Sequence, residues 1–400
     1  MPKKLKRNIT LVYGLAFFHS FMIIVPVIVP FFMSKGLGLA EIFYLQTVYA
    51  ATIVLLEAPS GYIADVFGRR MALLVGSVFH GFGYLYLNIA DDFTQLIIFE
   101  ITVGIAGSLL SGADLALLFD TRKALDADQI APHSKEIARL GFMRSFAEGL
   151  GALLGGVLAM WSFDLMILVQ SVAAWMCLLM VLLVVEPPYK NTSGQIVDMR
   201  IVAIIRHLLG SDPVLKSVFF AIPVYSLVSF HAVWLIQPYW ESRGVSLALF
   251  GVLWCSQSLV VAIANHFGYT IERKRGAVFA LALIGALPIA GHFAMAWLGG
   301  WAGIIACWLL FFGRGLNQVI LVNALNRRIP SEFRATANSL TSFTFRLGFI
   351  TTGPLVGYIA DSQGLTTALN LLGLVSIVVF ALIMMPLIQT VRALQRQVTV

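Results

Sequence analysis

Long apolar segments separated by short polar links dominate the chain. Two of these segments, roughly 41–60 and 71–90, are each close to the ~20 residues that an α-helix needs to cross a bilayer. The link between them, 61–70 (GYIADVFGRR), is so short that the two helices must form a hairpin. A chain built in this way has to place its apolar helices in a membrane.

The overall composition agrees with this prediction. Hydrophobic residues make up 59% of the chain and charged residues only 12%, whereas a soluble globular protein carries about 25% charged residues. The surplus apolar surface would be unfavourable in water, so we expect it to face lipid.

Division of the chain at its polar links predicts twelve spans. The first follows a basic N-terminus that imitates a signal peptide. Its apolar run is too long for one, and no small-residue cleavage site follows, so we expect a retained span. The expected spans are 8–33, 41–62, 70–90, 94–119, 136–160, 163–186, 214–240, 246–270, 276–298, 300–323, 332–360 and 365–389.

Basic residues are distributed unequally between the two sides of this arrangement. Of the 27 lysines and arginines, 22 fall on the side of the N-terminus and only Lys35 and Arg243 on the opposite side. Cytoplasmic loops carry the excess of positive charge. We therefore expect both termini in the cytoplasm, a plasma membrane location (a bacterial inner membrane), and no nucleic-acid partner for the net charge of +7.

The sequence repeats itself at a nearly constant offset. Residues 30–40 resemble 238–248 at an offset of 208, and 61–65 resemble 268–272 at an offset of 207. The pentapeptide GYIAD recurs at 357–361. We predict an all-α membrane protein of twelve transmembrane helices in two pseudo-symmetric six-helix bundles.

This duplication sets the expected domain boundaries. An N-terminal bundle covers 1–186 and a C-terminal bundle covers 214–400. The linker 187–213 contains an amphipathic stretch, which predicts a helix on the cytoplasmic lipid surface.

The link 61–70 has its own chemistry. Gly61 and Gly68 permit a close approach and an unusual turn. Asp65 can pair with Arg69 and Arg70. This pattern, G-x-x-x-D-x-x-G-R-R, resembles the loop between the second and third spans of major facilitator superfamily transporters.

The resemblance implies a charge network that holds the cytoplasmic side closed, with Asp120 as its partner at the end of span 4. The chain departs from the superfamily elsewhere. No basic residue occurs around 100–107, where an arginine motif is expected, and the span-5 antiporter motif survives at 151–156 without its proline. The whole is similar to a bacterial drug/metabolite:proton antiporter-like branch.

Polar groups inside spans cost free energy unless they have partners or a wet cavity. In span 4, Ser111 and Asp114 share one face with three small residues, which fits either a cavity wall or a close helix contact. In span 10, Arg314, Asn317 and Gln318 share a face that lipid would not tolerate, which favours a cavity. Other candidates for the substrate cavity are Tyr13, Arg144, His231, Gln237 and Arg346, although a lone histidine is more often a packing residue.

Spans 5 and 11 carry matching faces at an offset of 202, with an arginine above two glycines in each. These faces would let each span pack closely against the opposite half. The symmetry is broken at Glu148, which corresponds to Ile350. Glu148 is therefore the first candidate for proton coupling and Asp114 the second; a static ion pair between Glu148 and Arg144 is the alternative.

These features predict a proton-coupled secondary transporter that exports a small organic molecule by alternating access around a midplane site. The chain contains no HExxH, nucleophile, Walker or Rossmann motif, so we expect no enzyme activity, cofactor or metal. Uptake or uniport of an organic anion is the alternative, and a membrane sensor or intramembrane enzyme is a weaker one. The expected partners are the substrate, protons and the bilayer, and we expect a monomer.

Overall fold

The computed structural model describes residues 2–125, 133–188, 204–210, 212–330 and 333–398. Regular structure within these residues is helical throughout. The segments expected as spans 1–6 contain α1 (Pro2–Ser20), η1 (Val25–Val27), α2 (Ile28–Ser34), α3 (Leu39–Val66), α4 (Arg69–Leu87), α5 (Phe93–Leu110), α6 (Ala113–Leu125), α7 (His133–Ala159) and α8 (Phe163–Leu183).

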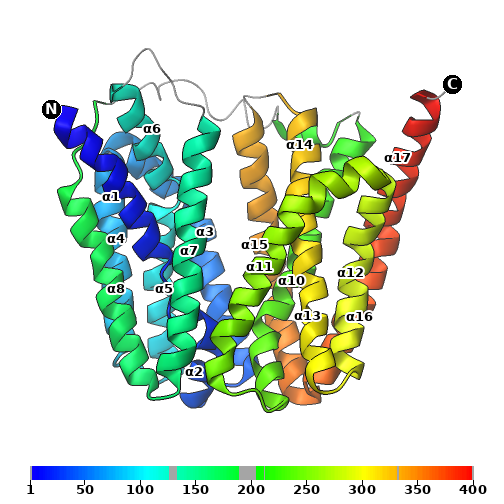
Figure 1. Ribbon diagram of the computed structural model, residues 1–400, viewed down its shortest axis with the longest axis horizontal. Coiled ribbons are helices and arrows are strands. Elements are labelled where there is room, and N and C mark those ends of the chain that lie inside the picture. The colour runs from blue at the N-terminus through cyan, green and yellow to red at the C-terminus, as the bar shows by residue number, and fades with distance from the viewer. Residues whose placement is uncertain (1, 126–132, 189–203, 211, 331–332, 399–400) are drawn as a thin grey trace. The chain divides into compact units, whose positions relative to one another are not determined.

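The segments expected as spans 7–12 are likewise helical (Figure 1). They contain α10 (Pro213–Ser242), α11 (Leu247–Arg275), α12 (Ala277–Trp297), α13 (Gly300–Leu316), η2 (Asn317–Leu321), α14 (Val322–Arg328), α15 (Arg334–Gln363), α16 (Leu365–Val379), η4 (Phe380–Met384) and α17 (Met385–Val398).

Ten helical segments among the described residues are long and apolar enough to cross a membrane. The two remaining expected spans, 70–90 and 332–360, are the helices α4 and α15. The prediction of an all-α membrane protein is therefore confirmed.

The chain forms two compact units whose boundaries differ from the two halves of the sequence. The first unit is Met1–Leu37, Tyr44–Gln195 and Ser246–Cys255. The second is Gly38–Phe43, Ile196–Val245 and Ser256–Val400. The beginning of α3 thus belongs to the second unit and the beginning of α11 to the first.

The two units repeat the same helix packing. In the first, α4 packs against α5 and α8, and α1 packs against α7. In the second, α12 packs against α13 and α16, and α10 packs against α15. These are the same pairs of spans in each half, which is the arrangement that a duplicated sequence predicts.

Matching glycines show the duplication at the level of the backbone. Gly68 precedes α4 with φ 97° and Gly276 precedes α12 with φ 86°. Gly36 and Gly244, which the sequence repeat aligns, have φ of 87° and 75°. Residues with a Cβ rarely adopt this left-handed conformation, so the repeated glycines mark repeated turns.

Span 1, expected to be one helix, is interrupted after α1. The buried side chain of Gln170 on α8 binds two backbone groups at this break. It accepts a hydrogen bond from the Ile23 N–H at 2.5 Å and donates one to the Phe21 carbonyl at 3.4 Å. Gly155 of α7 permits the close packing, because a Cβ at this position would lie 1.9 Å from the Ile23 carbonyl oxygen. An irregular backbone within a membrane needs such partners, since lipid offers none.

Span 4 is also broken. Its two helices, α5 and α6, are separated by Ser111 in an extended conformation and by Gly112, whose φ is 82°. Spans 10 and 12 contain π-helical turns at Asn317–Leu321 and Phe380–Met384. The π-turn of span 10 begins three residues after Arg314.

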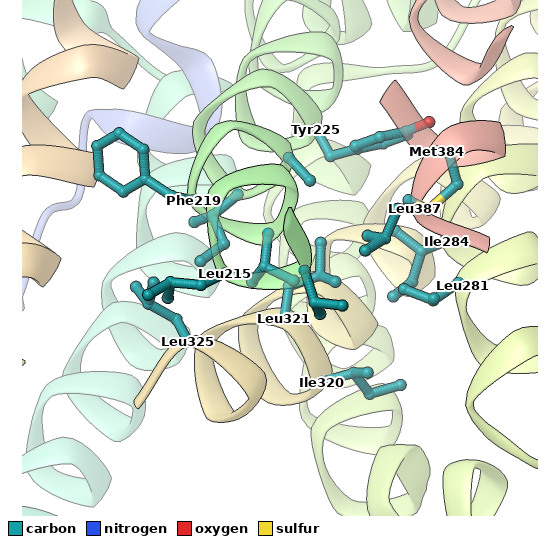
Figure 2. Packing of buried hydrophobic residues seen from close by; sticks show 14 of the residues in the cluster. Leu215, Phe219, Tyr225, Leu281, Ile284, Ile320, Leu321, Leu325, Met384 and Leu387 are labelled. Atoms are coloured by element: carbon teal, nitrogen blue, oxygen red, sulfur yellow. The ribbon is translucent and has the colours of Figure 1, made fainter. Parts of the chain in front are cut away.

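Each unit has its own apolar core. In the second, Leu215, Phe219 and Tyr225 of α10 pack with Leu281 of α12 and Met384 of η4 (Figure 2). The core of the first unit is formed by residues of α1, α4, α6 and α8 together with parts of α3, α5 and α7.

The linker differs from its prediction. Most of its amphipathic stretch, 189–203, lies outside the described residues. In the part that is described, Ile204 and Leu208 are buried in the core of the second unit rather than facing lipid. Apolar side chains bury wherever a protein surface can exclude them from water, and the second unit provides such a surface.

Large apolar side chains remain exposed on the transmembrane helices. Leu55 is 74% exposed, Leu382 71% and Val172 61%. Soluble monomers rarely expose extensive apolar surface. Exposure of this kind along helices of membrane-spanning length is expected where lipid covers them.

Candidate functional site

The link between α3 and α4 forms the predicted charge network. Arg69 Nη1 lies 2.7 Å from Asp65 Oδ1, one helical turn earlier. Arg69 Nε lies 3.8 Å from Asp120 Oδ2, which is an ion pair beyond hydrogen-bond distance. Asp120, about fifty residues away in sequence, is thus brought to the Asp65–Arg69 pair as the resemblance implied, all within the first unit.

Glu186 belongs to the same network but was not predicted from the sequence. Its carboxylate accepts from the backbone N–H groups of Arg69 at 2.9 Å and Arg70 at 2.8 Å. These groups begin α4, where a carboxylate is favoured by the helix dipole and by unpaired N–H donors. Gly68 permits the approach, because a Cβ there would lie 3.0 Å from Glu186 Oε1.

The pentapeptide that recurs at the end of span 11 has a different partner. The carboxylate of Asp361 accepts from the backbone N–H groups of Leu39 at 2.8 Å and Ala40 at 2.7 Å. It therefore caps the beginning of α3 within the second unit. Gly357 contacts the same segment, since a Cβ there would lie 2.8 Å from the Leu39 carbonyl oxygen.

The face of span 4 serves two purposes. Gly104 and Gly107 make close contacts with Thr52 and Tyr49 of α3, so this part of the stripe is a helix contact. Ser111, at the break, is exposed. Asp114, in the first turn of α6, is buried and forms an ion pair with Arg144 Nη2 of α7.

This ion pair corrects the proposed partnership of Arg144 with Glu148. Within the described residues Arg144 pairs with Asp114 instead, because the break in span 4 turns α6 so that Asp114 faces α7. The His19 imidazole of α1 interacts electrostatically with both members of the pair. Its ring lies 5.2 Å from that of His80 on α4. A titratable cluster therefore lies between α1, α4, α6 and α7.

Glu148 lies next to this cluster on α7 and is half-buried. Its Oε1 lies 3.4 Å from the indole Nε1 of Trp254, which is in the part of α11 that belongs to the first unit. The neighbouring Gly149 carbonyl accepts from the Cys255 thiol at 3.2 Å. Glu148 thus faces a segment from the other half of the sequence.

Tyr13 was predicted to line a substrate cavity, but its hydroxyl donates to Glu136 of α7. The Glu136 side chain is buried and also pairs with Arg122 at 2.8 Å and with Arg139 at 3.8 Å. Tyr13 is therefore part of an ion cluster. Glu136 gave no signal in the sequence, because an acid at the beginning of a span resembles an ordinary first-turn residue.

The second unit contains a cavity of about 230 Å³. Its lining comes from α10, from α15, and from α13 with the π-turn η2. The lining residues are Ile222, Pro223, Ser226, Phe230, Arg314, Gln318, Thr341, Ser342 and Phe345. Of the predicted group in span 10, the cavity therefore includes Arg314 and Gln318.

Asn317 does not line this cavity. It is buried, and its amide donates to the Ile222 carbonyl at 3.2 Å and to Ser226 Oγ at 3.0 Å. It fixes the π-turn to α10 and so sets the positions of its neighbours. The three polar residues are thus divided: Asn317 binds α10, whereas Arg314 and Gln318 line the cavity.

Three other predicted cavity residues also lie outside that lining. His231 is buried, and its Nε2 lies 3.0 Å from Thr352 Oγ1 on α15. Gln237 is buried as well. Arg346, on α15, is half-buried. His231 thus fits the packing alternative.

Comparison with known proteins places these features in a family. The sequence profile of the Major Facilitator Superfamily matches residues 9–350. An uncharacterised MFS-type transporter of Salmonella typhimurium is 28% identical over 165 residues, which cover 39% of this chain and 37% of that protein. Solute carrier family 22 member 1 of Oryctolagus cuniculus is 27% identical over 130 residues, 32% of this chain and 22% of that one. The matched regions thus span well under half of either relative.

Solved structures agree in fold. The nucleoside transporter NupG has a TM-score of 0.75 at 10% identity, covering 96% of this chain and 98% of that one. The D-xylose–proton symporter has a TM-score of 0.68 at 14% identity, covering 95% of this chain and 97% of that one. Together with the family match and the charge network of the α3–α4 link, this shows a membrane transporter rather than an enzyme: the chain belongs to the Major Facilitator Superfamily.

Proposed function

We propose that this transporter is proton-coupled and exports a small organic molecule by alternating access. The observation that carries the proposal is the titratable cluster in the first unit, where Asp114 and Arg144 are paired beside Glu148 and His19. Ionisable groups in membrane-spanning segments are costly and are retained chiefly where they carry ions, protons or substrates.

The broken spans support a transport site in the same unit. Span 1 is interrupted beside α7, and span 4 is interrupted just before Asp114. In secondary transporters, discontinuous helices form substrate and coupling-ion sites near the bilayer midplane. The D-xylose–proton symporter offers a proton-coupled example of the same fold.

We propose export rather than uptake because span 5 keeps the glycines of an antiporter-type motif, although it lacks the motif's proline. Gly151 and Gly155 contact the interrupted part of span 1, and Gly156 contacts the beginning of α11, where a Cβ would lie 2.8 Å from the Ala248 carbonyl oxygen. Uptake or uniport of an organic anion remains the second candidate, because arginines lie within the spans of both units.

The coupling mechanism can be tested with the purified protein. A thermal-shift screen first identifies a compound that stabilises the native state. In proteoliposomes, an antiporter then moves protons out of an acidic lumen as that compound enters. Proton movement in the same direction as the compound would show symport, and compound movement without protons would show uniport; either would contradict proton-coupled export.

We also propose a bacterial inner membrane location with cytoplasmic termini. In a background without native cysteines, thiols placed in 121–134, 190–195 and 327–331 should react only from the cytoplasm; 126–132 and 190–195 lie outside the described residues. Cysteines replacing Ser34, Asp91 and Gly299 should react only from outside. Labelling of any of these from the wrong side would disprove the proposed topology.

A further inference from the structure

The cavity of the second unit is small and is lined by residues of α10, α13, η2 and α15. Its volume of about 230 Å³ equals that of roughly eight water molecules at about 30 Å³ each. This is below the usual range of drug-sized sites, about 300–1,000 Å³. A ligand held here must therefore be a small molecule, or a small part of a larger one.

The lining has a positive charge and no negative one. Arg314 contributes a guanidinium, and none of the nine described lining residues is acidic. A guanidinium presents its N–H donors in a planar fork that matches the two oxygens of a carboxylate. A lysine ammonium group does not present such a fork. One such group neutralises the single charge of a monoanion, whereas it leaves half the charge of a doubly charged phosphate unbalanced.

The other polar groups of the lining divide into two kinds. The hydroxyls of Ser226 and Thr341 donate to the carbonyls of Ile222 and Asn338, each at 2.8 Å, and are thus committed to the protein. Among the described residues, none is hydrogen-bonded to the Gln318 amide or the Ser342 hydroxyl. These two side chains can therefore donate to a ligand beside Arg314.

The remaining wall is apolar and aromatic. The rings of Phe230 and Phe345 are 5.1 Å apart at an angle of 75°, in the edge-to-face arrangement that aromatic pairs favour. Ile222 and Pro223 extend this wall along α10. A ligand that satisfies both parts has an anionic end and an apolar body.

We propose that this cavity binds a small monocarboxylate with an apolar body, and that Arg314 binds its carboxylate. This inference rests on the proposed function for one point alone, namely that the bound monocarboxylate is the transported substrate. Binding is a separate property, so it can be measured whether or not transport is proton-coupled.

Benzoate is a suitable probe, and benzamide is its uncharged counterpart of nearly the same shape. Titration calorimetry on the full chain in lipid nanodiscs should show tighter binding of benzoate than of benzamide, benzylamine or phenyl phosphate. Arg314→Gln should weaken benzoate binding about 10- to 150-fold, because charge-assisted hydrogen bonds are lost. Arg314→Lys should lie between this variant and the wild type, since it keeps the charge but not the fork.

Arg275→Gln is the matched control, because Arg275 is exposed at the end of α11, away from the cavity. It should bind benzoate like the wild type, and the melting temperature of each variant shows that it is folded. Equal binding of benzoate and benzamide, tighter binding of phenyl phosphate, or unchanged benzoate binding in folded Arg314→Gln would overturn the proposal. Proton-coupled transport of a compound without a carboxylate, together with no binding of benzoate, would overturn the proposal while leaving the proposed function intact.

Discussion

Glu148→Gln is expected to abolish uphill accumulation of substrate under a pH gradient while leaving substrate binding and exchange intact. Glutamine keeps the size of the side chain and can still contact Trp254, but it cannot take up a proton. One-for-one exchange with protons gives about tenfold accumulation per pH unit, because both correspond to about 1.4 kcal/mol. The variant should therefore fall from about tenfold to no accumulation.

The position of Glu148 explains why so large an effect is expected. Arg144 is paired with Asp114, so Glu148 is not required to neutralise that arginine. Its carboxyl group faces α11, a helix from the other half of the sequence. A change in this contact during alternating access would change the hydration of the carboxyl group, as a proton-coupling group requires.

Uptake of labelled substrate into proteoliposomes provides the measurement, with counterflow exchange measured in parallel. Glu241→Gln serves as the control, because Glu241 is exposed near the end of α10. If Glu148→Gln still concentrates substrate under the gradient, Glu148 is structural. Asp114 then becomes the candidate for the coupling group.

Asp65→Asn is expected to raise the population of the state that is open to the cytoplasm. The substitution removes the 2.7 Å ion pair between Asp65 and Arg69, and the ion pair of Arg69 with Asp120 is longer, at 3.8 Å. If the network holds the cytoplasmic side closed with about 1–3 kcal/mol, the ratio of the two states changes about 5- to 150-fold.

Spin labels at the cytoplasmic ends of α3 and α15 measure this change as longer distances in the variant. Asp91→Asn is the control, because it removes an exposed ion pair with Lys35 on the other side of the membrane by the proposed topology. Identical distance distributions in Asp65→Asn and the wild type would show that the network does not control the equilibrium.

The architecture of this protein could largely be predicted from its sequence. Among the described residues, apolar segments of membrane-spanning length predicted where the transmembrane helices lie, although not the breaks in spans 1 and 4. The prediction succeeds because lipid demands a continuous apolar surface wherever a helix crosses it. The repeat offset aligned Gly36 with Gly244, and the structure gives both the same left-handed turn. Such features are local, since each depends on a few neighbouring residues.

The sites were predicted only where sequence neighbours form them. Asp65 and Arg69 are one turn apart, so their ion pair was visible in the pattern of the link. Glu186 lies more than one hundred residues away, and its position at the beginning of α4 follows from the packing of α8 against α4. The alternative of a static pair between Arg144 and Glu148 considered only the acid one turn away and missed Asp114, which pairs with Arg144 in the structure.

The sequence by itself determined a membrane protein of duplicated helical spans with a charged link between its second and third spans. Hydropathy and repeated glycines act locally, so they can be interpreted without knowing which helices are neighbours. Only the tertiary structure decided that Arg144 pairs with Asp114, that Tyr13 joins Glu136, and that Arg314 lines a cavity from which Asn317 is excluded. These partnerships depend on breaks in spans 1 and 4, on the π-turn of span 10, and on which helix faces meet. None of these is specified by the period of an apolar pattern.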